Sequence, residues 1–138
     1  MKTLLTAYHV RHLDRSVDFY AKVGFDEIGR VSFEDGSIRV MLNLPGDGEV
    51  ATVELVYDPK LDSIDVGTGF SHIAVQVDDL NGTLVDFGKK GVTFDSPQRP
   101  DGDNGPKTCF VRDPDAYRIE LVQWPPAHAD GITRADFL

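Results

Sequence analysis

The chain carries one residue pattern twice. Residues 5–13 (LTAYHVRHL) match residues 72–80 (HIAVQVDDL), which lie 67 positions later. Residues 53–56 (VELV) match residues 119–122 (IELV), which lie 66 positions later. Because two unrelated patterns share nearly the same offset, the sequence indicates an internal duplication. The fold must therefore be built from two similar modules, with matched residues in equivalent places.

The matched positions differ in one chemically important place. Glu54 corresponds to Glu120, but His72 corresponds to Leu5. Pseudo-twofold packing of the two modules would bring these four residues together. Carboxylate and imidazole groups bind metal ions, whereas a leucine side chain cannot. We therefore expect three of the four residues to be capable of metal binding.

The length of the chain favours one domain over two independent ones. The chain has 138 residues, and a module of about 60 residues forms only a marginal core by itself. We expect a single domain over 1–138, with modules at about 3–57 and 69–123 and a C-terminal tail at 124–138. Two prolines near the start of the tail separate it from the last strand.

Composition argues against several classes of function. The net charge of −9 argues against nucleic acids and anionic membrane surfaces as partners. No apolar stretch approaches the roughly 20 residues of a membrane span, and the N-terminus is not typical of a signal peptide. Cys109 is the only cysteine, so an internal disulfide framework is excluded and a reducing, cytoplasmic location is expected. These features do not choose among small-molecule functions.

Each module is predicted to contain a strand, a helix and further strands. In the first helix, Asp14 is the expected N-cap and Gly24 follows the C-terminus. In the second helix, Asp79 and Gly91 take these roles. The expected apolar stripes are Leu13, Val17, Tyr20 and Ala21 in the first helix and Leu80, Leu84 and Phe87 in the second.

The predicted strands complete a βαβββ pattern in each module. This pattern places the chain in the α+β class. The strands are expected at 4–10, 26–33, 37–44 and 50–57 in the first module and at 72–77, 92–95, 107–112 and 117–123 in the second.

Alternation along the strands separates aliphatic from polar residues. Successive side chains point to opposite faces of a sheet. Val53 and Leu55 therefore share the face that the helix covers, and Glu54 lies on the other face. By the same rule His72 and Glu120 lie on the face away from the helix of the second module. If the sheets curve, this face lines a cavity.

The two glutamates allow a simple interpretation and a functional one. A carboxylate in the middle of a strand is costly when it is buried without a partner. For one such glutamate, solvent exposure or pairing with Arg39 or Arg118 would be a sufficient explanation. Two glutamates at matched positions, together with His72, favour a metal site instead. Imidazole and carboxylate ligands suit Zn, Ni, Co, Mn or Fe.

Four motifs carry a resemblance to a known family. They are LDRSVDFY at 13–20, VELVY at 53–57, GTGFSHIAV at 67–75 and DPDAYRIEL at 113–121. In these motifs the chain resembles the vicinal oxygen chelate superfamily, and within it glyoxalase I (lactoylglutathione lyase). The resemblance implies the glyoxalase/bleomycin-resistance/dioxygenase fold, in which two paired βαβββ modules have curved sheets that form a cavity.

The resemblance also implies a set of metal ligands. In glyoxalase I, four side chains from repeat-equivalent strands hold a divalent metal. Three of these positions fall on Glu54, His72 and Glu120, and the fourth, which is His or Gln in glyoxalases, falls on Leu5. The implied cofactor is a divalent metal held by three protein ligands, with Zn or Ni favoured and Co or Mn as alternatives.

Two further positions depart from the glyoxalase pattern for binding glutathione. His9 stands where glyoxalases often carry an Arg that contacts a glutathione carboxylate, so His9 is the candidate cofactor-binding residue. Asp58 stands in place of an assisting Asn, and its charge would repel a carboxylate. A different thiol adduct, or a substrate without glutathione, therefore stays open.

The resemblance implies a reaction as well as a site. Glu120 is the expected catalytic base and Glu54 the second candidate, acting on an α-oxo thiol hemithioacetal through an enediolate, with His72 as a plain ligand. A homodimer is expected because glyoxalases build each site from two subunits. The main alternative is a non-catalytic, drug-binding protein of the bleomycin-resistance type, which Leu5 favours. An epimerase or a ring-cleaving dioxygenase is a third interpretation.

Overall fold

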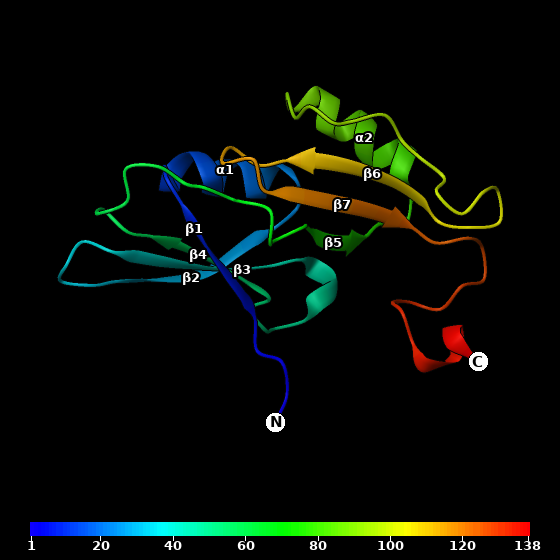
Figure 1. Cartoon of the computed structure of the whole chain (residues 1–138), viewed down its shortest axis with the longest axis horizontal. Helices are drawn as coiled ribbons and strands as arrows, with labels where there is room; N and C mark the ends of the chain where they lie inside the picture. Colours follow the sequence, from blue (N-terminus) through cyan, green and yellow to red (C-terminus); the bar gives the residue numbers. More distant parts are fainter. The chain divides into compact units, whose positions relative to one another are not determined.

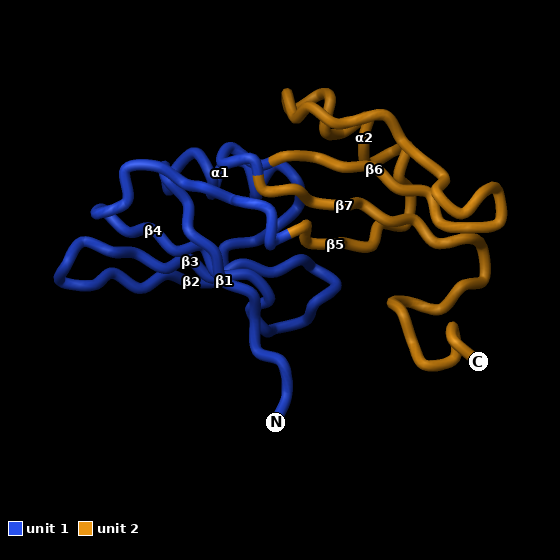
Figure 2. The backbone as a smooth tube through the Cα atoms, in the orientation of Figure 1, with its two compact units in different colours: residues 1–70, 113–116 blue, residues 71–112, 117–138 orange.

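Two compact units make up the chain. The computed structural model describes residues 1–138. Unit 1 holds residues 1–70 and 113–116, and unit 2 holds residues 71–112 and 117–138 (Figure 2). The division falls close to the start of the second expected module. That the two units form one domain stays a prediction.

Unit 1 has the predicted βαβββ order (Figure 1). Its elements are β1 (Thr6–Val10), α1 (Leu13–Lys22), β2 (Asp26–Ser32), β3 (Ile38–Asn43) and β4 (Val53–Tyr57), with a short 3-10 helix η1 at Pro45–Asp47. The sheet order is β1-β4-β3-β2, with β1 parallel to β4 and the other pairs antiparallel. Tyr20 of α1 and Leu42 and Leu55 of the sheet are fully buried and form the centre of the core.

Unit 2 repeats this plan with a smaller sheet. Its elements are β5 (Ile73–Gln76), α2 (Leu80–Lys89), β6 (Lys107–Arg112) and β7 (Arg118–Gln123), with a short 3-10 helix η2 at Arg134–Phe137. The order is β5-β7-β6, with β5 parallel to β7 and β6 antiparallel to it. The α+β class predicted from the sequence is therefore confirmed.

The expected strand at 92–95 is wrong. Only Phe94 forms a bridge, to Val111 of β6, and a second isolated bridge joins Gln98 to Thr108. Pro97 lies between the two bridges. A proline has no N–H to donate to a ladder, which accounts for two isolated bridges in place of a fourth strand.

The duplication extends to the pairing of residues in the sheets. In unit 1, Ala7 of β1 is the partner of Glu54 in β4. In unit 2, Ala74 of β5 is the partner of Glu120 in β7. The two parallel pairs therefore have the same register, as the repeated sequence pattern predicts.

The helix predictions are confirmed for α2 and corrected for α1. Asp79 caps α2, because its Oδ1 accepts a hydrogen bond from the Gly82 N–H at 3.1 Å. The predicted stripe of α2 is the buried face of that helix. In α1 the N-cap is His12, without a side-chain cap, and Asp14 lies inside the first turn. The buried residues of α1 are Leu13, Ser16 and Tyr20, whereas Val17 is half-buried and Ala21 is exposed.

The turn at residues 113–116 belongs to unit 1 because polar side chains hold it there. Tyr8 donates its hydroxyl hydrogen to Tyr20 Oη at 2.7 Å, and Tyr20 donates to Asp113 Oδ2 at 2.8 Å. Asp115 Oδ2 accepts from the Arg11 N–H at 3.2 Å. The contacts to Asp113 and Asp115 join residues 93 and 104 positions apart in the sequence.

The helices of the structure also bear on membrane insertion. No helix combines the length and the apolar character that crossing a membrane requires.

Candidate functional site

His72 and Glu120 come together on one face of the unit 2 sheet. His72 directly precedes β5, and Glu120 alternates along β7 with the buried Ile119 and Leu121. The distance from His72 Nε2 to Glu120 Oε1 is 3.7 Å. Their side chains are 30% and 22% exposed, respectively, so this pair is accessible to a ligand.

Neighbouring side chains fix the orientation of the His72 ring. Ser71 Oγ lies 2.7 Å from His72 Nδ1, within hydrogen-bond distance. The Phe110 ring meets the imidazole edge-on, with centroids 5.3 Å apart. Arg118, one of the expected alternative partners for a glutamate, instead places its guanidinium 3.9 Å from the Phe110 ring centroid. The contact at Nδ1 leaves Nε2 directed at Glu120.

Glu54 occupies the matched position in unit 1 but has a different environment. It is 7% exposed. Arg39 Nη1 lies 3.3 Å from Glu54 Oε1, as the simple interpretation of the sequence expected. The approach lacks hydrogen-bond geometry, so this buried oxygen has a charged neighbour and no hydrogen-bond donor. Arg39 also lies over the Phe33 ring, with 5.4 Å to its centroid.

The remaining predicted site residues also lie in unit 1. Leu5 directly precedes β1 and is half-buried. His9 is exposed on β1, opposite Val56 of β4. Asp58 follows β4 and accepts a hydrogen bond from the Lys60 N–H at 2.9 Å, so its carboxylate stabilises a turn.

His72 and Glu120 are donor groups that suit a divalent metal, but this pair alone does not complete a site. In neither unit do three or more His, Cys, Asp or Glu side chains form a group that could hold a metal. Any two nitrogen or oxygen ligand atoms of a tetrahedral zinc ion lie about 3.4 Å apart. The 3.7 Å between His72 and Glu120 needs only a small side-chain movement to reach this value. In unit 1, Glu54 Oε1 accepts no hydrogen bond and lies beside the Arg39 guanidinium.

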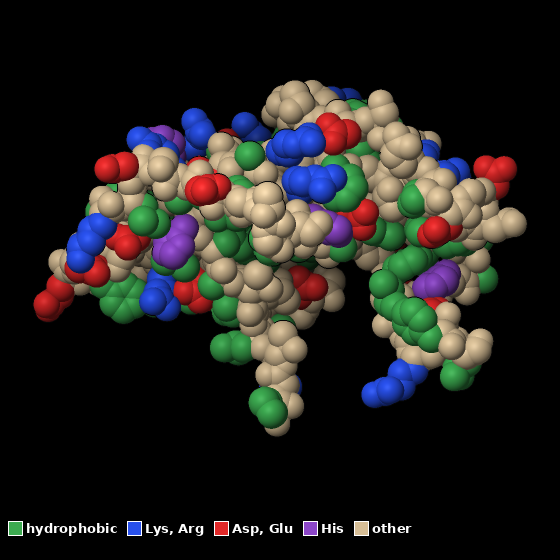
Figure 3. All heavy atoms as spheres, viewed as in Figure 1, with side chains coloured by type: hydrophobic (Ala, Val, Ile, Leu, Met, Phe, Trp, Pro, Cys, Tyr) green, Lys and Arg blue, Asp and Glu red, His purple; other side chains and the backbone are tan.

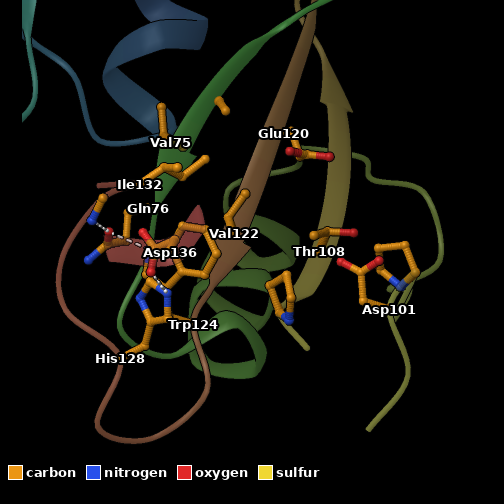
Figure 4. Close-up of a pocket in the computed structure, with 14 residues that line it drawn as sticks. Val75, Gln76, Asp101, Thr108, Glu120, Val122, Trp124, His128, Ile132 and Asp136 are labelled. Atoms are coloured by element: carbon orange, nitrogen blue, oxygen red, sulfur yellow. Dashed lines mark hydrogen bonds and ion pairs between the residues drawn. The ribbon is translucent and has the colours of Figure 1, made fainter. Parts of the chain in front are cut away.

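A pocket of about 650 Å³ lies beside Glu120, entirely within unit 2. Val122 and Trp124 continue the Glu120 face of the sheet into this pocket, and Asp101 borders it on another side (Figure 4). His128 and Ile132 of the C-terminal tail form a further wall. The pocket therefore has the Glu120 carboxylate, a candidate proton-transfer group, beside a largely aliphatic and aromatic surface.

Sequence reasoning missed the contribution of the tail to this pocket. Gln76 of β5 accepts hydrogen bonds from Trp124 Nε1 at 2.7 Å and from the Gly131 N–H at 2.9 Å. The Gln76 amide also donates to Asp130 Oδ1 at 2.7 Å. The residues next to Gln76 in the sequence form no pattern that predicts these hydrogen-bond partners. The only available signal was its position, two strand residues from Ala74 and hence on the face of His72.

Comparisons with known sequences identify the family to which the chain belongs. The sequence model of the family described as "Glyoxalase/Bleomycin resistance protein/Dioxygenase superfamily" matches residues 4–121. The lactoylglutathione lyase of Escherichia coli O157:H7 is 33% identical over 126 residues, which cover 89% of this chain and 93% of that protein. A lactoylglutathione lyase of Arabidopsis thaliana is 31% identical over 125 residues, but the chain spans only 44% of its length.

Solved structures of glyoxalase I have a fold similar to that of this chain. The trypanothione-dependent glyoxalase I of Leishmania major matches with a TM-score of 0.73 and 30% identity, covering 89% of this chain and 86% of that one. Glyoxalase I of Zea mays matches with a TM-score of 0.78 and 28% identity, covering 87% of this chain and 43% of that one. The paired-module architecture is therefore shared with glyoxalase I structures.

Proposed function

Because the chain belongs to the Glyoxalase/Bleomycin resistance protein/Dioxygenase superfamily, we propose that it is a metal-dependent lyase of the lactoylglutathione lyase type. Its substrate is the hemithioacetal of a 2-oxoaldehyde and a thiol, and its product is the 2-hydroxyacyl thioester. The observation that carries this proposal is the His72–Glu120 pair, 3.7 Å apart on the accessible face of unit 2.

Glu54, His72 and Glu120 are the residues that would hold the metal. Zn or Ni is the favoured ion, and Co or Mn are alternatives. When bound, such an ion acts as a Lewis acid that stabilises negative charge on the substrate oxygens. Leu5 supplies no ligand, so only these three protein groups are available. His72 can coordinate through Nε2 if Nδ1 keeps its proton and donates it to Ser71 Oγ at 2.7 Å.

Glu120 is the proposed base. It removes the proton from the carbon next to the substrate carbonyl, which gives an enediolate, and returns the proton to the neighbouring carbon. The reaction is an isomerisation, so it needs no oxidant or reductant. Glu54 is the second candidate for this proton transfer because it occupies the matched position of the repeat. Val122 and Trp124 line the space beside Glu120 with apolar surface.

The assembly and location of the protein form part of the same proposal. The active form is a homodimer, and each site combines residues from two subunits. His9 is proposed to contact the thiol part of the substrate. The protein is proposed to act in the cytoplasm, where its single Cys109 remains reduced.

Metal content is the first measurement that tests the proposal. Elemental mass spectrometry of the untagged protein should find about one divalent ion per chain, and His72→Ala should abolish binding because it removes the imidazole ligand. His12→Ala is the matched control, since His12 is an exposed histidine before α1. If no metal binds, even after titration with Zn, Ni, Co or Mn, the proposal of a metal-dependent lyase is wrong.

Turnover tests the role of Glu120 separately. Glu120→Gln should lower kcat for hemithioacetals of methylglyoxal by about 10²- to 10⁴-fold, because the amide cannot accept the proton. Thioester formation gives the readout, and retained metal content distinguishes a lost base from a lost ligand. Glu34→Gln, in an exposed turn, is the control. A Glu120→Gln variant with full turnover would contradict the assignment of the base.

Non-catalytic binding of a small molecule or drug is the second candidate function. It is favoured by Leu5 at the fourth ligand position and by Arg39, whose charge beside Glu54 opposes cation binding. This function requires no metal. Tight binding of an apolar drug by metal-free protein, together with no turnover of any hemithioacetal, would support it over the lyase.

A further inference from the structure

The C-terminal tail gives the pocket beside Glu120 a fixed wall. Gln76 binds the tail at Trp124, Asp130 and Gly131 through three hydrogen bonds of 2.7 to 2.9 Å. The Trp124 and His128 rings stack at 4.4 Å with an interplanar angle of 15°. Figure 3 shows hydrophobic side chains and a histidine on this tail. The wall is therefore held by contacts within unit 2 and needs no ligand to form.

The ionisable groups of this pocket are mostly acidic. Three carboxylates line it, those of Asp101, Glu120 and Asp136, and His128 is the only basic side chain. No Lys or Arg lines the pocket. Lys107, at the start of β6, directs its Nζ to Asn81 Oδ1 instead. A ligand with negative charges would therefore find no lysine or arginine side chain in this lining to pair with.

Asp136 keeps its charge at neutral pH. Its Oδ2 accepts hydrogen bonds from the backbone N–H of Thr133, at 2.6 Å, and from the Thr133 hydroxyl. This backbone hydrogen bond, with the nearby His128, holds the pKa of the Asp136 carboxyl below its ordinary value. His128 Nε2 lies 3.3 Å from Asp136 Oδ1, so the one basic group is already beside a carboxylate.

Together these features define a substrate class. Resting on the proposed lyase function, we propose that the tail pocket holds the non-reacting part of the thiol and selects thiols without net negative charge. Trp124, Val122 and Ile132 offer apolar contact to methylene groups of such a thiol. Glutathione, with two carboxylates and one ammonium group, is repelled by the acidic lining and by the net charge of −9.

Binding of non-reacting analogues tests this selection directly. The probes are S-methylglutathione and its diethyl ester, which differ in the masking of two carboxylates. Trp124 is the only tryptophan of the chain, so its fluorescence reports occupation of the pocket. The diester should bind on the order of 10-fold more tightly at low salt, and the ratio should fall toward one at high salt as the charges are screened. Equal or tighter binding of the acid, or no response of Trp124 to either probe, overturns the proposal.

Charge reversal separates electrostatics from the extra apolar contact of the ester groups. Asp101→Lys places a cation on the pocket lining and should reduce the preference for the diester several-fold. Asp103→Lys is the matched control, because Asp103 lies in the same loop but does not line the pocket. If the two variants change the ratio equally, the local charge of the pocket does not select the ligand.

Turnover distinguishes this inference from the proposed function. Hemithioacetals of methylglyoxal with glutathione and with its diethyl ester are compared by kcat/KM. Preferential binding of the diester analogue without turnover of either adduct contradicts the lyase and leaves the pocket preference standing. Turnover in which the glutathione adduct equals or exceeds the diester adduct overturns the preference and leaves the lyase standing.

Discussion

The surroundings of Tyr20 are supplied partly by a distant segment of the chain. Its side chain is fully buried. Its hydroxyl accepts a hydrogen bond from the Tyr8 hydroxyl and donates one to the Asp113 carboxylate. Its ring meets Phe25 edge-on, with centroids 5.5 Å apart. Burial, and then the neighbouring Tyr8 and Asp113, raises the pKa of Tyr20 far above its ordinary value. The folded state therefore keeps this phenol protonated.

Tyr20 should make stability fall in alkaline solution. The unfolded chain releases the phenol proton above pH of about 10, while the folded chain retains it. The contribution of Tyr20 is thus complete below that pH and declines above it, by up to about 1.4 kcal/mol per pH unit. Denaturant titrations at successive pH values should show a shallower decline for Tyr20→Phe than for the wild-type protein.

Tyr57→Phe is the control for this measurement, because Tyr57 is a half-buried tyrosine of the same unit. At neutral pH, Tyr20→Phe should also cost about 1 to 3 kcal/mol, since the buried Asp113 loses a donor. The same alkaline decline in Tyr20→Phe and wild type would show that this phenol does not control the effect.

Helix α2 shows how a cap and a glycine act together. Asp79 caps the helix, and Gly82 stands in its first turn, where helix propensity disfavours glycine. A Cβ atom at Gly82 would lie 2.5 Å from Asp79 Oδ2. The absence of a side chain at Gly82 therefore leaves space for the Asp79 carboxylate. The N-cap that Asp79 forms compensates for the weak helix propensity of the glycine.

The two helices should respond differently to the loss of an aspartate. Asp79→Ala should destabilise the protein by about 1 kcal/mol, because it removes the N-cap of α2. Asp14→Ala should cost only a few tenths, about 0.3 kcal/mol, because Asp14 interacts with the α1 dipole but caps nothing. Urea denaturation of both variants gives the comparison. Equal losses would mean that the cap of α2 contributes no more than a charge in the first turn.

At the scale of the whole molecule, the proposed ligands divide between the units. Glu54 belongs to unit 1, whereas His72 and Glu120 belong to unit 2. In neither unit is a group of three ligands complete. If the active form is a symmetric dimer, one chain can supply Glu54 and the other chain can supply His72 and Glu120 to each site.

Mixing two inactive variants tests this arrangement. When Glu54→Gln and Glu120→Gln chains are unfolded and refolded together, a shared site leaves one intact site in each mixed dimer. Random pairing then restores roughly a quarter of the wild-type turnover. If each site comes from one chain, every site carries one substitution and the mixture stays inactive. Each variant refolded alone is the control.

Local patterns were sufficient to predict much of the fold and the candidate ligands. The repeat predicted the matched registers of Glu54 and Glu120, because side-chain alternation and strand pairing follow short-range periodicity. The same alternation placed His72 on the face of Glu120, where the structure brings their side chains together. The capping preference of Asp79 likewise needed only its own helix.

Tertiary structure decided the features that join distant residues. The Tyr20–Asp113 hydrogen bond spans 93 positions, and the contact of Gln76 with Asp130 spans 54. Polar groups can choose among many partners, and packing brings only some of them within hydrogen-bond distance. For this reason the sequence determined the two modules and the identity of their candidate ligands. Only the folded chain decided between Arg39 and Arg118 as the neighbour of Glu54 and turned the C-terminal tail into a wall of the pocket.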